Sequence, residues 1–231
     1  MKVGVVVFPG TNCEADVAEA LRALGGDAEL LWHGDGHVPA DVGAVILPGG
    51  FAHGDYLRTG AIARFSPIMG AVAELADAGR PILGICNGFQ ILCEAGLLPG
   101  ALQRNQGLKF LCTTTEIVVE SSTTIATLAT GEGDVLRLPI NHFEGNYTCS
   151  DAAMEDLVDH DQVVFRYVDN PNGSMGDIAG VCNRERNVVG LMPHPERASH
   201  ELLGSVDGRG ILASVLAAAV IGPAAAATSP G

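Results

Sequence analysis

The segment Pro81-Ile-Leu-Gly-Ile-Cys-Asn-Gly-Phe-Gln90 contains the residue best suited to covalent chemistry. Cys86 stands in a Gly-x-Cys-x-Gly turn between an apolar run and a helical pattern, which is the setting of the nucleophile in the elbow of many hydrolases. A sulfur at a helix N-terminus is favoured as thiolate, because the helix dipole and the free N–H groups both stabilise negative charge. The sequence therefore predicts that Cys86 is a nucleophile. The alternative, which we hold for the other five cysteines, is a small buried apolar side chain.

Reactive residue types also occur in Gly190-Leu-Met-Pro-His-Pro-Glu196. A thiolate that attacks an amide needs a group that protonates the leaving amine near neutral pH, and histidine is the usual choice. Pro195 disfavours helix at His194, so we expect His194 and Glu196 to project to the same side of an extended chain. Glu196 would then orient the imidazole and complete a Cys–His–Glu triad. Without the elbow, a histidine after a strand is more often structural.

A glycine pair, Gly49-Gly50, directly follows another apolar run. Bare backbone there can approach a developing oxyanion, and we expect the N–H groups of Gly50 and Asn87 to be the donors. An ordinary tight turn is the alternative. Gln90 follows Cys86 by four residues and shares its helix face, so it could contact the substrate. The alternative for Gln90 is an exposed helical side chain.

Alternating strands and helices must position these residues. Apolar β-branched runs predict strands at 3–8, 28–32, 44–47 and 82–85, and helical spacing predicts helices at 13–24, 68–78 and 87–94. Asn12 is the expected N-cap of the first helix. Such alternation is typical of an α/β protein with a mostly parallel sheet and helices on both faces. In these sheets ligands bind beyond the carboxyl ends of the strands, where the three motifs fall.

The chain after Pro99 is richer in strands. We expect them at 110–120, 135–140, 163–168, 179–183 and 188–192, as an antiparallel extension of the sheet, and a last helix at 210–220. Residues 1–221 are long enough for one domain with one core. Residues 222–231 are rich in alanine and proline, which predicts a frayed tail.

Composition excludes several classes of function. The net charge is −14, from 27 acidic and 13 basic residues with no basic run, which argues against a nucleic-acid partner. Neither a phosphate-binding motif nor histidines at metal-ligand spacing occur, so we expect no nucleotide cofactor and no metal in this chain. The absence of a signal peptide or membrane-spanning run and six scattered cysteines favour a cytoplasmic protein with reduced thiols.

These motifs resemble those of the class I (triad) glutamine amidotransferases. The elbow at 84–90 and the Met192-Pro-His-Pro-Glu196 segment carry the likeness, with the glycine pair preceding them in the family's order. The resemblance implies a flavodoxin-like fold and glutamine hydrolysis through a cysteinyl thioester. It also assigns Cys86, His194 and Glu196 to catalysis.

Within this family, three segments look like the glutaminase subunits of phosphoribosylformylglycinamidine synthases: residues 48–58, 86–90 and 170–174. What this implies is an ammonia donor for a large synthetase subunit that uses ATP and Mg²⁺ to make formylglycinamidine ribonucleotide in purine biosynthesis. A small third subunit would bridge the complex. His53 and Phe143 depart from the usual pattern, and His142 and Glu144 remain candidate interface residues or parts of a polar loop.

Three other functions stay open. The chain could feed ammonia to a different acceptor, and the Gly-Asp-Tyr-Leu-Arg segment at 54–58 is the discriminating feature. It could be a standalone cysteine hydrolase of the same fold, which would need no partner. It could also be a non-catalytic binding module, in which case an alkylating glutamine analogue would not label Cys86.

Overall fold

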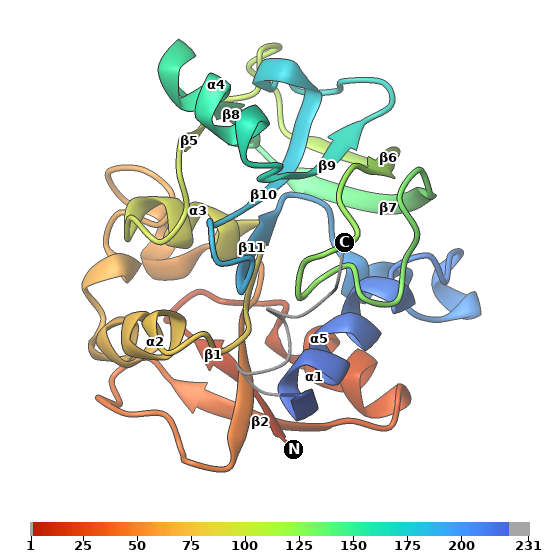
Figure 1. The fold of residues 1–231 in the computed structure, drawn as a ribbon. Helices are drawn as coiled ribbons and strands as arrows, with labels where there is room; N and C mark the ends of the chain where they lie inside the picture. Colours follow the sequence, from red (N-terminus) through yellow and green to blue (C-terminus); the bar gives the residue numbers. More distant parts are fainter. Residues whose placement is uncertain (1, 222–231) are drawn as a thin grey trace.

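The computed structural model describes residues 2–221, and its central feature is one nine-stranded sheet (Figure 1). One half of the sheet is parallel. In spatial order it consists of β2 (Asp27–Trp32), β1 (Lys2–Val7), β3 (Val42–Leu47), β4 (Ile82–Ile85) and β11 (Val188–Leu191). This strand order, 2-1-3-4 followed by a fifth parallel strand, is that of flavodoxin-like folds. The expected fold class is confirmed.

The other half of the sheet is antiparallel, as expected for the chain after Pro99. It continues from β11 through β10 (Ile178–Cys182), β9 (Val163–Tyr167), β6 (Leu111–Val119) and β7 (Val135–His142). Two short strands, β5 (Ala101–Gln103) and β8 (Asn146–Thr148), pair in a separate ribbon. These two strands were not predicted, because three residues are too few to show an alternating pattern.

Helices cover both faces of the parallel half. Helices α1 (Glu14–Ala23) and α5 (Arg209–Ile221) contact each other on one face, while α2 (Pro67–Asp77) and α3 (Asn87–Glu94) lie on the other (Figure 1). Strands β3, β4 and β11 are buried along their whole length between these layers. Their continuous apolar sequences follow from burial on both faces.

Two local expectations for the helices differ from the structure. The N-cap of α1 is Cys13 rather than Asn12, and it makes no side-chain capping bond. The Asn12 side chain instead accepts a hydrogen bond from the Cys13 thiol at 3.2 Å. Helix α4 (Asp151–Asp159) was not predicted, although Ser150 caps it by accepting from the Ala153 N–H at 3.2 Å.

The final helix was predicted correctly, and the tail at 222–231 lies outside the described residues. Within the part of the chain that the structure describes, no helix is long and apolar enough to cross a membrane.

The sheet brings the three sequence motifs together. The glycine pair follows β3, Cys86 follows β4, and the segment with His194 follows β11. These strands are adjacent and parallel in the order β3-β4-β11. Their carboxyl ends therefore lie side by side, and residues far apart in the sequence meet at one edge.

Close packing of α3 against β3 makes one glycine at this edge indispensable. A Cβ on Gly88 would lie 1.9 Å from the Leu47 carbonyl oxygen. We expect Gly88→Ala to lower the free energy of unfolding by about 3 kcal/mol, since neither backbone can yield easily. Urea unfolding followed by circular dichroism measures this.

Gly70→Ala is the matched control for this prediction. A Cβ on Gly70, in the middle of α2, would meet no atom within 4 Å. It should stabilise the protein by about 0.5–1 kcal/mol through higher helix propensity. Equal effects of the two substitutions would show that the contact with Leu47 is not limiting.

Candidate active site

Cys86 occupies a strained backbone position at the junction of β4 and α3. Its φ of 50° and ψ of −104° are rare for a residue with a side chain, and such strain is typical of functional turns. Its N–H donates to the Leu191 carbonyl at 2.8 Å, which ties the elbow to β11. The side chain is 5% exposed. The predicted elbow is therefore present, with the sulfur at the N-terminus of a helix.

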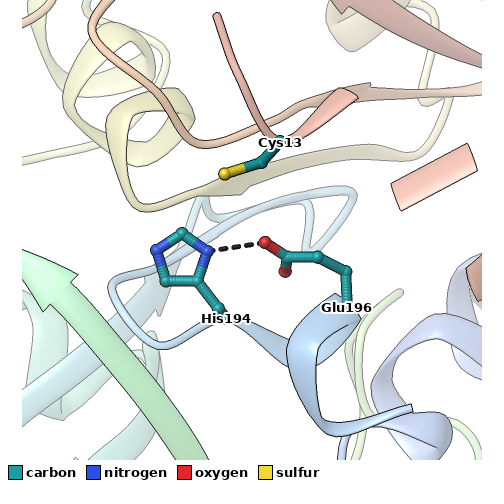
Figure 2. Close-up of side chains that lie close together, drawn as sticks. All are labelled: Cys13, His194 and Glu196. Atoms are coloured by element: carbon teal, nitrogen blue, oxygen red, sulfur yellow. Dashed lines mark hydrogen bonds and ion pairs between the residues drawn. The ribbon is translucent and has the colours of Figure 1, made fainter. Parts of the chain in front are cut away.

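His194 and Glu196 meet as the sequence predicted. The Nδ1 of His194 lies 2.6 Å from the Glu196 Oε1, and both residues are 2% exposed (Figure 2). Because the carboxylate accepts, Nδ1 carries the proton, and Nε2 is left for Cys86. His194 is extended as expected, but Glu196 lies in a 3-10 turn, η4 (Pro195–Ala198). The turn, rather than an extended chain, brings the carboxylate to the ring.

The pKa of His194 reflects two opposing effects. Burial disfavours the charged imidazole, but the negative charge of Glu196 and the neighbouring Cys86 outweigh burial and raise the pKa well above its ordinary value. The Nε2 atom has no hydrogen-bond partner among residues 2–221. A protonated His194 beside a Cys86 thiolate is the charge state that this site favours.

Cys13 contacts the triad although its sequence context predicted only a buried apolar role. Its sulfur lies beside the ring of His194 and near Glu196, with one donor atom of each within 4.8 Å (Figure 2). The Arg197 guanidinium donates to the Cys13 sulfur at 3.2 Å. Three such donors could ligate a metal, but a cation here would face the guanidinium and disrupt the His194–Glu196 bond. We interpret Cys13 as packing support for the imidazole.

The remaining cysteines show no comparable environment. All six are free. Cys182 is buried and Cys93 and Cys149 are half-buried, whereas Cys112 is exposed, contrary to the expectation of a buried side chain. Cys112 lies on β6 at a position that faces solvent, which its small size permits.

A cavity of about 120 Å³ opens beside Cys86. Ten residues from three segments line it: Gly50, Phe51, Asp55, Thr59, Cys86, Gln90, Asn141, His142, Phe143 and Glu144. A larger cavity of about 530 Å³ lies at the opposite, amino ends of β4 and β11, lined in part by Gly79 and Val188. We place the substrate beside Cys86, because only that cavity contains the nucleophile.

The two glycines after β3 have different positions. Gly50 lines the cavity, with a φ of 148° and a virtual Cβ only 2.7 Å from the Thr11 Cα. A Cβ on Gly49 would instead lie 2.7 Å from the His194 Cε1. Gly49 therefore makes room for the imidazole, a role that the sequence did not indicate. The oxyanion role of the Gly50 and Asn87 N–H groups stays a prediction.

Asn87 and Gln90 form a buried amide network below the cavity. The Asn87 amide nitrogen donates to the Gln90 Oε1 at 2.9 Å and to the Asp55 Oδ1 at 3.2 Å. Gln90 is 4% exposed and its amide donates to the Glu144 carbonyl. An exposed helical glutamine is thus excluded, and Gln90 faces the cavity as predicted.

Both candidate interface residues in the loop after β7 line the cavity. The expectation was wrong for the His142 side chain, which is 3% exposed and so unavailable to a partner. Its Nδ1 lies 3.0 Å from the Asn105 Oδ1, and the Asn105 amide nitrogen donates to two carbonyls. The Asn105 oxygen must therefore accept, and the ring is protonated at Nδ1.

Asp55 is the most perturbed carboxyl of the cavity wall. Burial, followed by the charge of Glu144, raises its pKa to about 6, against a smaller lowering by the bond from Asn87. The folded protein therefore binds this proton more tightly than the unfolded chain. Stability from this group is present below pH 4 and falls as the pH rises to about 6.

We expect Asp55→Asn to raise the melting temperature at pH 7.5, because it removes a half-buried charge that no cation compensates. The gain should disappear toward pH 4, where Asp55 is already protonated. Thermal unfolding between pH 4 and 8 measures this. Glu19→Gln, on the exposed face of α1, is the control and should show no such pH dependence. A gain that persists at pH 4 would contradict the electrostatic cause.

Comparisons with known proteins agree with this site. A family described as the CobB/CobQ-like glutamine amidotransferase domain matches residues 1–210. The phosphoribosylformylglycinamidine synthase subunit PurQ of Rubrobacter xylanophilus is 55% identical over 96% of this chain and all of its own length. The subunit of the same name from a Nostoc species is 53% identical over 95% of this chain and all of its own length.

Solved structures place the fold in the same group. A chain in the structure of PurLQS from Thermotoga maritima superposes with a TM-score of 0.86 and 44% identity, over 94% of this chain and 97% of that chain. A putative GMP synthase protein from Thermoplasma acidophilum has a TM-score of 0.63 at 19% identity, over 96% and 94%, which supports the fold alone. The chain belongs to the glutamine amidotransferase family, in its PurQ branch.

Proposed function

We propose that this chain is the glutaminase subunit of a phosphoribosylformylglycinamidine synthase. The observation that carries the proposal is the strained Cys86 at the helix N-terminus, with the buried His194–Glu196 pair on the adjacent strand end. In a chain more than 50% identical to PurQ proteins over nearly its full length, this arrangement is what glutamine hydrolysis requires.

The reaction begins with attack of the Cys86 thiolate on the side-chain carboxamide carbon of glutamine. The N–H groups of Gly50 and Asn87 hold the oxyanion that forms. His194 gives a proton to the nitrogen as the C–N bond breaks, and ammonia leaves. Water then attacks the thioester with His194 as base, which releases glutamate and restores the thiolate.

The ammonia passes to a synthetase partner. That large subunit uses ATP and Mg²⁺ to convert formylglycinamide ribonucleotide to formylglycinamidine ribonucleotide, and a small bridging subunit completes the complex. The present chain needs no cofactor of its own for the hydrolysis, and the cytoplasm is its proposed compartment. An unpartnered glutaminase would waste glutamine, so we expect activity to rise when the synthetase docks and orders the site.

Replacing the nucleophile tests the chemistry directly. Cys86→Ala should abolish glutamate release from glutamine, because no other sulfur lines the cavity, while ammonia-dependent synthesis by the complex persists. Cys93→Ala is the matched control, since Cys93 lies on the same helix but bonds the Pro99 carbonyl at 3.7 Å. It should retain activity. Glutamate release by Cys86→Ala would refute the assignment, and release that ignores the synthetase would point to another acceptor.

Glu196→Gln tests the support of the imidazole. Loss of the carboxylate charge should reduce kcat roughly 10²-fold, as for other losses of acid–base efficiency. Because Glu196 raises the pKa of His194, the variant imidazole should lose its proton at lower pH, and the alkaline limb of kcat/KM should shift downward. Glu201→Gln, on an exposed turn, is the control. An unshifted limb would contradict this role.

A further inference from the structure

The wall of the cavity opposite the elbow carries acceptors of hydrogen bonds and no cationic residue. Asp55 and Glu144 contribute carboxylates, and none of the ten lining residues is lysine or arginine. L-Glutamine carries an ammonium group on its Cα in addition to the carboxamide that reacts. A wall of this composition complements a positive charge rather than a negative one.

His142 adds an independent acceptor to the same wall. Its Nδ1 is the donor to Asn105, so the neutral ring has a lone pair on Nε2. That atom is buried and has no partner among residues 2–221. Burial and the charge of His194 lower the pKa of His142 to about 4, so the ring is neutral near pH 7. A buried acceptor without a partner is costly unless a ligand donates to it.

The two carboxylates differ in how their charge is compensated. Glu144 accepts from the Thr59 hydroxyl at 2.8 Å and lies 3.8 Å from the Arg104 guanidinium. Asp55 receives only the long bond from the neutral Asn87 amide, and no cationic side chain at 2–221 forms an ion pair with it. Asp55 is therefore the carboxylate with an unsatisfied requirement for a positive charge.

We propose that Asp55, with Glu144 and His142, forms the subsite for the α-ammonium group of glutamine, and that Asp55 is the residue that selects for it. The proposal rests on the function proposed above and adds to it the origin of amino-acid selectivity. The raised pKa of Asp55 fits this role, because an ammonium ion beside it would offset the cost of holding its charge half-buried.

Asn is the substitution that isolates the charge of Asp55. The residue has a φ of 53°, and Asn tolerates this left-handed conformation better than other residues with side chains. The amide oxygen of Asn can still accept from Asn87. Asp55→Asn therefore removes the negative charge and keeps the backbone and the neutral hydrogen bond.

The experiment compares L-glutamine with 4-carbamoylbutanoate, which is the same amide without the α-amino group. Ammonia release is measured for the chain assembled with its synthetase. In Asp55→Asn, kcat/KM for L-glutamine should fall roughly 10- to 100-fold, mainly through KM, as for loss of a charge-assisted bond. The value for 4-carbamoylbutanoate should change less than about twofold. Glu144→Gln should have a smaller effect, and Glu19→Gln, which changes net charge equally, should have none.

The outcomes separate this inference from the proposed function. Equal losses for the two amides would mean that Asp55 acts on the structure of the site, and an undiminished kcat/KM for L-glutamine would mean that it binds nothing. Either result overturns the inference while wild-type, Cys86-dependent glutamate release still supports the glutaminase. If the wild-type complex releases no glutamate, the proposed function fails, and the subsite fails with it.

Discussion

The site depends on the close approach of the backbone of α3 to the end of β3. Gly88 packs so tightly on the Leu47 carbonyl that a methyl group would overlap with it. This contact holds the first turn of α3 at the sheet edge and forces Cys86 into its strained conformation. The buried strands β3, β4 and β11 supply the rigid support, because a strained turn persists only where surrounding packing determines it.

The same edge concentrates polar groups that the apolar core cannot solvate. His194 and Glu196 are almost fully buried and compensate each other through a 2.6 Å hydrogen bond. Cys13 fills the space beside the imidazole, and Arg197 contacts the Cys13 sulfur. The ring is thus held from two sides, which leaves Nε2 as its free edge toward the nucleophile. Such fixed orientation lowers the reorganisation required when charge moves in the reaction.

The opposite wall of the cavity is arranged for binding rather than for bond breaking. Its carboxylates and the neutral His142 are held by Asn87, Asn105 and Thr59, so their acceptor atoms are fixed before a ligand arrives. Holding Asp55 there costs stability, as its raised pKa indicates. A cost of this kind is common in active sites, where groups are arranged for a ligand that is absent from the free protein.

Much of this protein could be predicted from its sequence because the decisive signals are local. A continuous apolar run before Gly-x-Cys-x-Gly predicts a buried strand, a turn and a nucleophile within one short segment, and Pro195 predicts the extended backbone of His194. Only the tertiary structure placed Cys13 beside His194, made Gly49 a gap for the imidazole, and turned His142 and Glu144 into the cavity wall. Those contacts join segments from different strand ends and loops, and they depend on strand order and loop path, which no local pattern encodes.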